Sequence, residues 1–253
     1  MPEYFKCSAR ITRVTINSDQ LYTDPADAEF NQPFWQASAA AFLIPTREYG
    51  HCAILVQRSP NTGNAGKWAC LPAGGCDNLE ELRNPEITVH REGIEELLIS
   101  WDGRELNPLQ FAVLRPMDEI EIYDETTGEI TSVTGEIHLS REGQFLFIQA
   151  YNLGIPLDED VIIKDGEIWV DPETGEKTEL DRRIAVVPIN KLDFEVNEKE
   201  LDHVQPAAMY KSGKWIESPP TINLSGYQTP TLEWLRRYVK RMKHALLWGG
   251  LRG

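Results

Sequence analysis

The segment from Asn84 to Ile99, NPEITVHREGIEELLI, constrains the fold most because it opens with the clearest helix signal in the chain. Asn84 suits the capping position, Pro85 the first helical position, and Glu86 adds a carboxylate to the first turn. Apolar residues then recur at helical spacing, at positions 87, 94, 97 and 98. The sequence therefore predicts a helix over residues 85–99 whose apolar face contains these four residues.

The rest of the chain has the character of β-structure. Residues 37–44 and 52–59, ASAAAFLI and CAILVQRS, predict a pair of strands, and residues 4–16 predict another. WACLPAGG, residues 68–75, predicts a short strand that closes into a tight turn. Short strands separated by turns are expected from about residue 109 to 190, then a short helical turn, and a largely irregular stretch to Gly226.

A second helix is expected over about residues 229–247. One face carries an apolar stripe and the other is basic, which we interpret as a solvated face rather than an anion site. The stripe comprises Leu232, Leu235, Val239, Met242 and Leu246, and the basic residues are Arg236, Arg237, Lys240, Arg241 and Lys243.

Composition limits the classes of function. The chain has 253 residues, 41% of them hydrophobic, with a formal net charge of −15, which argues against nonspecific binding to nucleic acid. No apolar run approaches the length of a membrane span and no signal peptide is recognisable, so we expect a cytoplasmic protein without membrane partners. The four cysteines form no C-x-x-C pair; Cys52 and Cys70 are interpreted as packed thiols.

The helix of residues 85–99 crowds three carboxylates. Glu92 lies one turn from both Glu95 and Glu96, and like charges at that spacing repel by a few tenths of a kcal/mol. Gly93 costs about 1 kcal/mol more relative to alanine. A hard divalent cation such as Mg²⁺ would neutralise the repulsion. Arg91 stands four residues before Glu95, close enough to pair with it; the alternative is a solvated acidic helix face.

The span from Trp68 to Ile99 resembles the Nudix box. Arg91 to Ile99, REGIEELLI, matches the second half of the motif, and Pro72 to Gly75 resembles its opening turn. There are three departures. Nine residues rather than seven separate Glu81 from Arg91, which leaves Glu80 and Glu81 as alternatives for the box glutamate. Leu98 stands in place of a glycine, and Gly93 in place of an apolar residue.

The resemblance, a degenerate box at residues 74–99, implies an α/β fold. The expected form is a Nudix-type α/β/α sandwich with a mixed β-sheet and a β-rich insertion. A single Nudix domain would span residues 1–253. Its core would cover about residues 36–200, with a β-hairpin elaboration at about 118–180 and the C-terminal helix at about 229–247.

The resemblance also implies a Mg²⁺- or Mn²⁺-dependent hydrolase that cleaves the diphosphate linkage of a nucleoside diphosphate derivative. Carried onto this chain, Glu92, Glu95 and Glu96 would be metal ligands, joined by the carbonyl of Ala73 or Gly74, with Arg91 orienting Glu95. Bound metals would neutralise the diphosphate and activate water. The general base stays open between Glu92 and later acids: Glu136, Glu142, Asp158, Glu159 and Asp160.

The substrate is less constrained. Pro72-Ala73-Gly74, with Pro116 further on, is similar to ADP-ribose pyrophosphatases, so an ADP-ribose-like substrate is one hypothesis. The aromatic residues that could stack on a base are Phe34, Trp35, Tyr151, Trp169, Trp215 and Tyr227, although each can equally be a packing residue. A homodimer is plausible by resemblance. The rival hypotheses are a catalytically weakened Nudix-fold nucleotide-binding or regulatory protein, and a structural acidic helix in an unrelated fold.

Overall fold

The computed structural model describes most of the chain, with gaps: residues 11–18, 35–58, 66–69, 73–107, 112–113, 118–139, 145–157, 160–165, 168–170, 177–179, 184–197, 200–224, 232, 235–237 and 239–240. The helical elements are α1 (Leu79–Arg83), α2 (Pro85–Glu96) and the 3₁₀ turn η3 (Ile189–Lys191). The strands are β1 (Arg13–Ile16), β2 (Trp35–Thr46), β3 (Gly50–Gln57), β4 (Trp68–Ala69), β5 (Ala73–Gly75), β6 (Leu97–Trp101), β7 (Arg104–Leu106), β8 (Ala112–Val113), β9 (Asp118–Asp124), β10 (Ile130–Leu139), β11 (Phe145–Asn152), β12 (Val161–Asp165), β13 (Ile168–Val170), β14 (Lys177–Glu179), β15 (Ile184–Pro188), β16 (Leu192–Asn197), β17 (Glu200–Pro206), β18 (Ala208–Lys211), β19 (Lys214–Glu217) and β20 (Ile222–Asn223).

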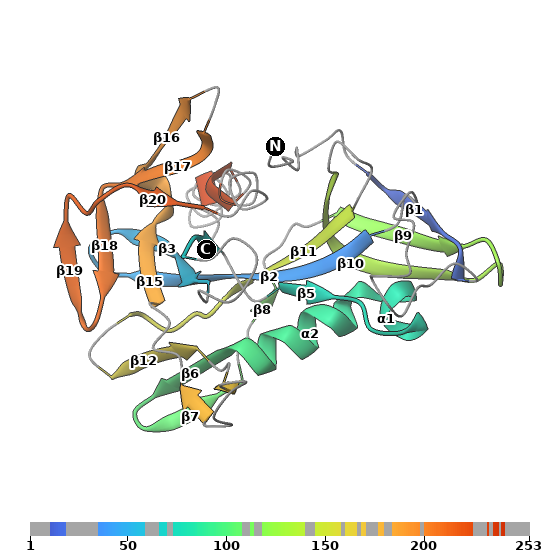
Figure 1. The fold of residues 1–253 in the computed structure, drawn as a ribbon, viewed down its shortest axis with the longest axis horizontal. Helices are drawn as coiled ribbons and strands as arrows, with labels where there is room; N and C mark the ends of the chain where they lie inside the picture. The colour runs from blue at the N-terminus through green and yellow to red at the C-terminus, as the bar shows by residue number, and fades with distance from the viewer. Residues whose placement is uncertain are drawn as a thin grey trace, which may run out of the picture.

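A mixed sheet forms the centre of the molecule. Its strand order is β1-β9-β10-β11-β2-β3-β15-β18-β19, with β4, β5 and β8 pairing at the sides. The pairs β1–β9 and β11–β2 are parallel, whereas the other pairs along this path are antiparallel. Figure 1 shows β2 crossing the middle, with α2 running below it. The predicted strand pair at residues 37–44 and 52–59 is therefore confirmed as β2 and β3.

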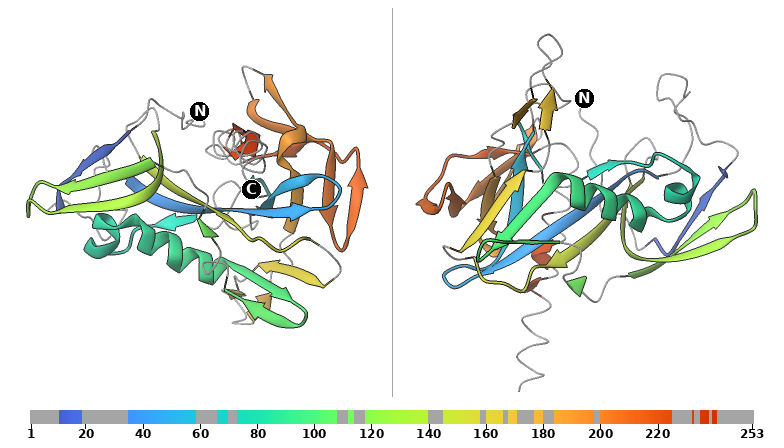
Figure 2. Two further views of the ribbon diagram at one scale, coloured as in Figure 1. Left: turned by 180° about the vertical axis from the view of Figure 1, so that it is seen from behind. Right: turned by 90° about the horizontal axis from the view of Figure 1, so that it is seen from below.

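The alternation of side chains along β2 divides the core into two layers. Ala40, Phe42 and Ile44 pack with Val89 of α2, while Ala39, Ala41 and Leu43 pack on the opposite face. That second layer contains the buried, helical residues Leu232, Leu235 and Val239. Helical residues thus pack on both faces of the sheet, as Figures 1 and 2 show. The part of the apolar stripe at Met242 and Leu246 lies outside the described residues.

Helix α2 begins at Pro85 as predicted, but it ends at Glu96 and not at residue 99. The Asn84 side chain accepts a hydrogen bond from the Glu86 amide at 3.2 Å, as expected for a cap. At Leu97 the backbone is extended, and β6 continues directly from the helix. Leu97 and Ile99 are buried and Leu98 is exposed, which is strand alternation. The partner strand β12 lies far along the chain, so local spacing did not reveal it.

The predicted apolar face of this helix is wrong. Ile94 is 54% exposed, while the buried face consists of Pro85, Thr88, Val89, Glu92 and Gly93. A carboxylate and a glycine therefore face the sheet at the centre of the helix. Leu98 falls in β6, opposite Lys164 of β12, so no glycine is needed to end the helix there.

The prediction that the segment before Gly226 is largely irregular is also wrong. Strands β16 to β20 occupy much of residues 192–223, because β16, β17 and β20 form a separate antiparallel sheet and β18–β19 is a hairpin. The predicted strands between residues 109 and 190 are present where the structure describes them, and η3 is the expected helical turn. Strands β9 to β11 belong to the central sheet, whereas β12 pairs with β6.

Two smaller expectations concern membranes and cysteines. In the described parts of the chain, no helix combines the length and apolarity needed to cross a bilayer. Cys52 is a buried free thiol, as predicted, while Cys70 lies outside the described residues.

Candidate functional site

The corner between α1 and α2 brings the box residues together. Asn78 caps α1 by accepting a hydrogen bond from the Glu81 amide at 3.0 Å. Asn84 ends α1 and caps α2, so the two helices follow one another with a single residue between them. This tight corner places α1 beside the middle of α2, where Arg91 and Glu92 lie.

Of the two alternatives, Glu81 is buried at this corner, whereas Glu80 is exposed. Its carboxylate accepts hydrogen bonds from Arg91 Nε at 3.1 Å, Thr88 Oγ1 at 3.0 Å and the Asp77 amide at 3.0 Å. Burial alone raises the pKa of Glu81, but the hydrogen bonds from Arg91, the Asp77 amide and Thr88 outweigh it, so the pKa is lowered. Glu81 is therefore a charged structural partner of Arg91.

Arg91 connects the end of β5 to both helices. Besides Glu81, its guanidinium donates to the Gly75 carbonyl at 2.9 Å and to Glu92 Oε1 at 2.6 Å. It also pairs with Asp77 at 3.2 Å. The hydrogen bond to Glu81 and the surrounding carboxylates raise the pKa of Arg91. Its expected pair with Glu95 is longer, at 3.7 Å, so Glu81 and Glu92 are the carboxylates that Arg91 holds most closely.

Glu92 sits between Arg91 and the backbone of the opening loop. It is 8% exposed, and burial is the main cause that raises the pKa of its carboxyl, opposed by Arg91 and reinforced by Glu95. A Cβ built on Gly74 would lie 1.9 Å from Glu92 Oε1. Only a glycine therefore lets the carboxylate reach this strand, because any side chain would occupy its place.

The remaining predicted ligands lie on α2 and β5. Glu95 is exposed, and Glu96 is the half-buried last residue of α2. Ala73 and Gly74 belong to β5 and pair with Ala39 and Ser38 of β2. Gly93 is buried, consistent with its interpretation as a point of close approach.

A divalent cation suits these residues in kind. Carboxylates and backbone carbonyls are the oxygen ligands that Mg²⁺ prefers, and the absence of a side chain at Gly74 leaves room for the Glu92 carboxylate. Among the described residues, however, no three His, Cys, Asp or Glu side chains converge as a ready metal site. The donors would have to close on the ion when it binds.

The acids considered as a general base are dispersed. Glu136 lies on β10 beside His138, with 3.4 Å between Glu136 Oε1 and His138 Nε2. Its neighbour Ile137 packs on the α2 side of the sheet, so alternation places Glu136 on the other face. The backbone carbonyl of Asp160 accepts a hydrogen bond from the Asp102 amide beyond β6. Glu142, Asp158 and Glu159 lie outside the described residues, so Glu92 is the candidate nearest the corner.

The aromatic and basic candidates include both buried packing residues and exposed residues. Tyr151 is buried, stacks on Phe42 and donates to Gln149 Oε1 at 2.7 Å, so it is a core residue. Trp215 is half-buried against Tyr49. Arg236, expected on a solvated face, is half-buried and donates to the Leu192 carbonyl at 3.1 Å. Arg237 and Lys240 are exposed as predicted. Trp35 lies at the start of β2 and Trp169 in β13, in positions whose side chains are not described. The other candidates lie outside the described residues: Phe34, Tyr227, Arg241 and Lys243.

The contributions of Thr88 and Asp77 did not emerge from the sequence. A signal was present, since Asn78-Leu79-Glu80-Glu81 has the spacing of a capping box, which places Glu81 at the start of a helix. In the structure the Glu81 carboxylate indeed accepts the amide of Asp77, just before the cap.

Comparison with known proteins gives a structural likeness but no match in sequence. No family model matches the chain, and no curated protein matches it either. Among solved structures, the chain is similar to a Nudix hydrolase from M. smegmatis, RenU, at 15% sequence identity and a TM-score of 0.39. The superposition covers 82% of this chain and 86% of that one. At this level of agreement, functional interpretation rests on the residues of the α1–α2 corner.

Proposed function

We propose that the protein is a divalent-metal-dependent hydrolase that cleaves the diphosphate linkage of a nucleoside diphosphate derivative, on a Nudix form of the α/β/α sandwich. The observation that carries the proposal is the buried Glu92 carboxylate seated in the space left by Gly74. A carboxylate with a raised pKa, beside two further glutamates and an arginine, is an arrangement that a bound cation stabilises.

In this proposal Glu92, Glu95 and Glu96 hold Mg²⁺ or Mn²⁺, with a carbonyl from Ala73 or Gly74. The metal, when bound, withdraws charge from the diphosphate and from water. The chain's own residues supply the rest. Arg91 keeps the opening loop against α2 through the Gly75 carbonyl and Glu81. The general base stays open between Glu92, the candidate nearest the corner, and the later acids.

One observation favours a second candidate, a nucleotide-binding protein that has weak or no turnover. The described residues contain no converged metal site, and Arg91 already neutralises Glu92 at 2.6 Å. An arginine in this position can replace a cation and leave the fold intact.

Turnover separates the two functions. The wild type should hydrolyse at least one member of a panel that includes ADP-ribose, only with Mg²⁺ or Mn²⁺ present, with EDTA as the metal-free arm. Glu92→Gln and Glu96→Gln should each lose at least about tenfold in kcat/KM. The matched control is Glu105→Gln, an exposed glutamate of β7, which should keep wild-type activity. Absence of metal-dependent turnover on every member would favour the binding protein.

A further inference from the structure

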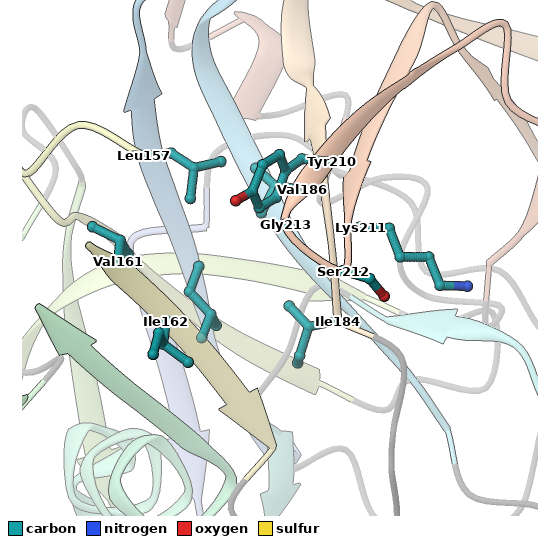
Figure 3. Close-up of a pocket in the computed structure, with 10 residues that line it drawn as sticks. Leu157, Val161, Ile162, Ile184, Val186, Tyr210, Lys211, Ser212 and Gly213 are labelled. Carbon is teal, nitrogen blue, oxygen red and sulfur yellow. The ribbon is translucent and has the colours of Figure 1, made fainter. Parts of the chain in front are cut away.

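A pocket of about 260 Å³ lies away from the carboxylates, where β12, β15 and the β18–β19 hairpin meet. Figure 3 shows its wall of aliphatic side chains and the ring of Tyr210, whose hydroxyl is directed toward Leu157. The described lining is mostly apolar: Leu157, Val161, Ile162, Ile163, Ile184, Val186, Tyr210, Lys211, Ser212 and Gly213. An apolar pocket with few polar groups is the usual form of a small-molecule site.

The walls of this pocket are held in place by their own contacts. The Tyr210 ring meets Trp215 edge-on at 5.5 Å, and Trp215 packs on Tyr49 at 4.4 Å. Ser212 and Gly213 both have positive φ, 51° and 81°, which is the conformation of a tight two-residue hairpin turn. These contacts hold the hairpin wall of the pocket in place.

The polar side chains in the described lining are those of Tyr210, Lys211 and Ser212. Among the described strands, β12 pairs only with β6, at the edge of the sheet β12-β6-β7. Val161, Ile162 and Ile163 of this strand line the pocket, and its second edge has no partner among the described strands. A ligand that fits here has apolar faces and a rim of hydrogen-bonding heteroatoms.

A flat heteroaromatic ring has this chemistry. A dry apolar cavity of about 150 Å³ holds benzene, so the larger volume here has room for a fused ring. We propose that the pocket between the edge of β12 and the β18–β19 hairpin binds the base of the substrate's nucleoside, with the ring of Tyr210 forming one wall. This assignment rests on the proposed function for its connection to a diphosphate.

The topology joins the pocket to the carboxylates. Strand β6 leaves α2 directly after Glu96, and its Ile99 is the register partner of Ile163 in β12. Three residues of strand span roughly 10 Å, and the neighbouring strand adds about 5 Å. That reach is of the order of one nucleoside, so the base can occupy the pocket while the diphosphate lies at the end of α2.

Free nucleosides test the pocket without any chemistry. Equilibrium dialysis of adenosine, guanosine, cytidine and uridine against the full chain, without metal, should show binding of at least one. Ile184→Trp, which fills the pocket, should weaken that binding at least tenfold. Tyr210→Phe keeps the ring and removes the hydroxyl, and should weaken binding by about 2- to 10-fold.

A second variant guards against misfolding of Ile184→Trp. Ile162 is 50% exposed, so Ile162→Asp should fold, yet it puts a carboxylate on the wall and should also weaken nucleoside binding. Its matched control is Ile130→Asp, on the distant β9–β10 hairpin, where the isoleucine is 56% exposed; this variant should bind as the wild type does. Circular dichroism of each variant verifies the fold.

The two proposals fail separately. Glu92→Gln should bind nucleosides with wild-type affinity, and Ile162→Asp should raise KM for hydrolysis without changing kcat. Nucleoside binding without turnover on any substrate would remove the hydrolase and keep the pocket. The pocket proposal is overturned if no nucleoside binds, if Ile162→Asp binds as tightly as the wild type, or if 2-naphthol, a ring with a single polar group, binds more tightly than every nucleoside.

Discussion

Asp124 and Glu92 are both buried carboxylates next to an arginine, and their surroundings differ. In the Asp124 cluster, formed by Asp124, Arg83, Ser18 and Thr126, the carboxylate accepts from Arg83 Nε at 2.8 Å, Ser18 Oγ at 3.1 Å and the Thr126 amide at 3.0 Å. These donors overcome the effect of burial and lower the pKa of Asp124 to about 2.

The Glu92 cluster, formed by Glu92, Arg91 and Gly74, is compensated less well. Arg91 holds one oxygen at 2.6 Å, but burial, Glu95 and Asp77 all act to raise the pKa of Glu92. An arginine beside a carboxylate therefore does not by itself define the role of that carboxylate. A carboxylate surrounded by donors fixes the structure, while one left short of donors is ready for a further positive charge.

The largest effect is expected when the Asp124 cluster is broken. Asp124→Asn should lower the free energy of unfolding by about 3 kcal/mol at pH 7, because Arg83 loses its buried partner. Since the folded pKa lies below the ordinary value of 3.8, this stability is present above about pH 4 and is lost as the pH falls toward 2. Urea unfolding between pH 7 and pH 2.5 measures it. A pH-independent loss would contradict the assignment.

Glu81→Gln should have the second largest effect on stability, about 2 kcal/mol, because Arg91 and Thr88 lose a charged acceptor. The lowered pKa of Glu81 means that this contribution, too, disappears as the pH falls below the ordinary range of a glutamate. Turnover should fall as well, since Arg91 positions the opening loop. Urea unfolding and kcat on the same samples test both, and full activity would show that Arg91 needs no anchor.

Gly74→Ala should separate activity from stability. Its new Cβ meets only the end of the Glu92 side chain, which can move, so we expect a loss of at most about 1 kcal/mol but at least tenfold in kcat/KM. Gly135→Ala is the matched control. There the Cβ meets the Phe147 ring and, at 2.8 Å, the Ile148 carbonyl, so stability should fall more than in Gly74→Ala and activity less. Equal activity in the two variants would show that the space at Gly74 has no role in catalysis.

The smallest expected change has the opposite sign. Glu92→Gln should stabilise the metal-free protein by a few tenths of a kcal/mol at pH 7, because it removes a buried charge and its repulsion of Glu95. A raised pKa in the folded state means that the wild type loses stability as the pH rises past the ordinary range of a glutamate. The gain should therefore vanish at pH 4. Thermal unfolding at the two pH values detects it, and destabilisation at pH 7 would place Glu92 with Asp124 as a structural carboxylate.

The sequence predicted those parts of the fold that depend on local patterns. The Asn84-Pro85 start of α2, the β2–β3 pair and the buried stripe at Leu232 follow from capping and periodicity, and the structure confirms them. The predicted end of α2 was wrong because the chain continues there as β6. This strand is stabilised by pairing with β12, about sixty residues later. The predicted buried face of α2 was wrong because the prediction assumed that the apolar residues face the core. In the structure Glu92 faces inward.

For the site, the sequence brought together Arg91, Glu92 and the Gly74 turn, and the structure places them in contact. The unusual loop length left Glu80 and Glu81 as alternatives in the sequence. Only the fold shows that the Glu81 carboxylate accepts a hydrogen bond from Arg91. The pocket beside β12 was invisible, since its lining residues come from distant strands and carry no motif.

The central claim is that Glu92 is a buried carboxylate that binds a divalent cation. Its most direct test is the difference in free energy of unfolding between wild type and Glu92→Gln as Mg²⁺ is titrated, with Glu105→Gln as control. Without metal Glu92→Gln should be the more stable; with saturating Mg²⁺ the wild type should overtake it, because binding to the folded state adds stability that the variant lacks. If Mg²⁺ stabilises both proteins equally, or neither, Glu92 is not part of a metal site.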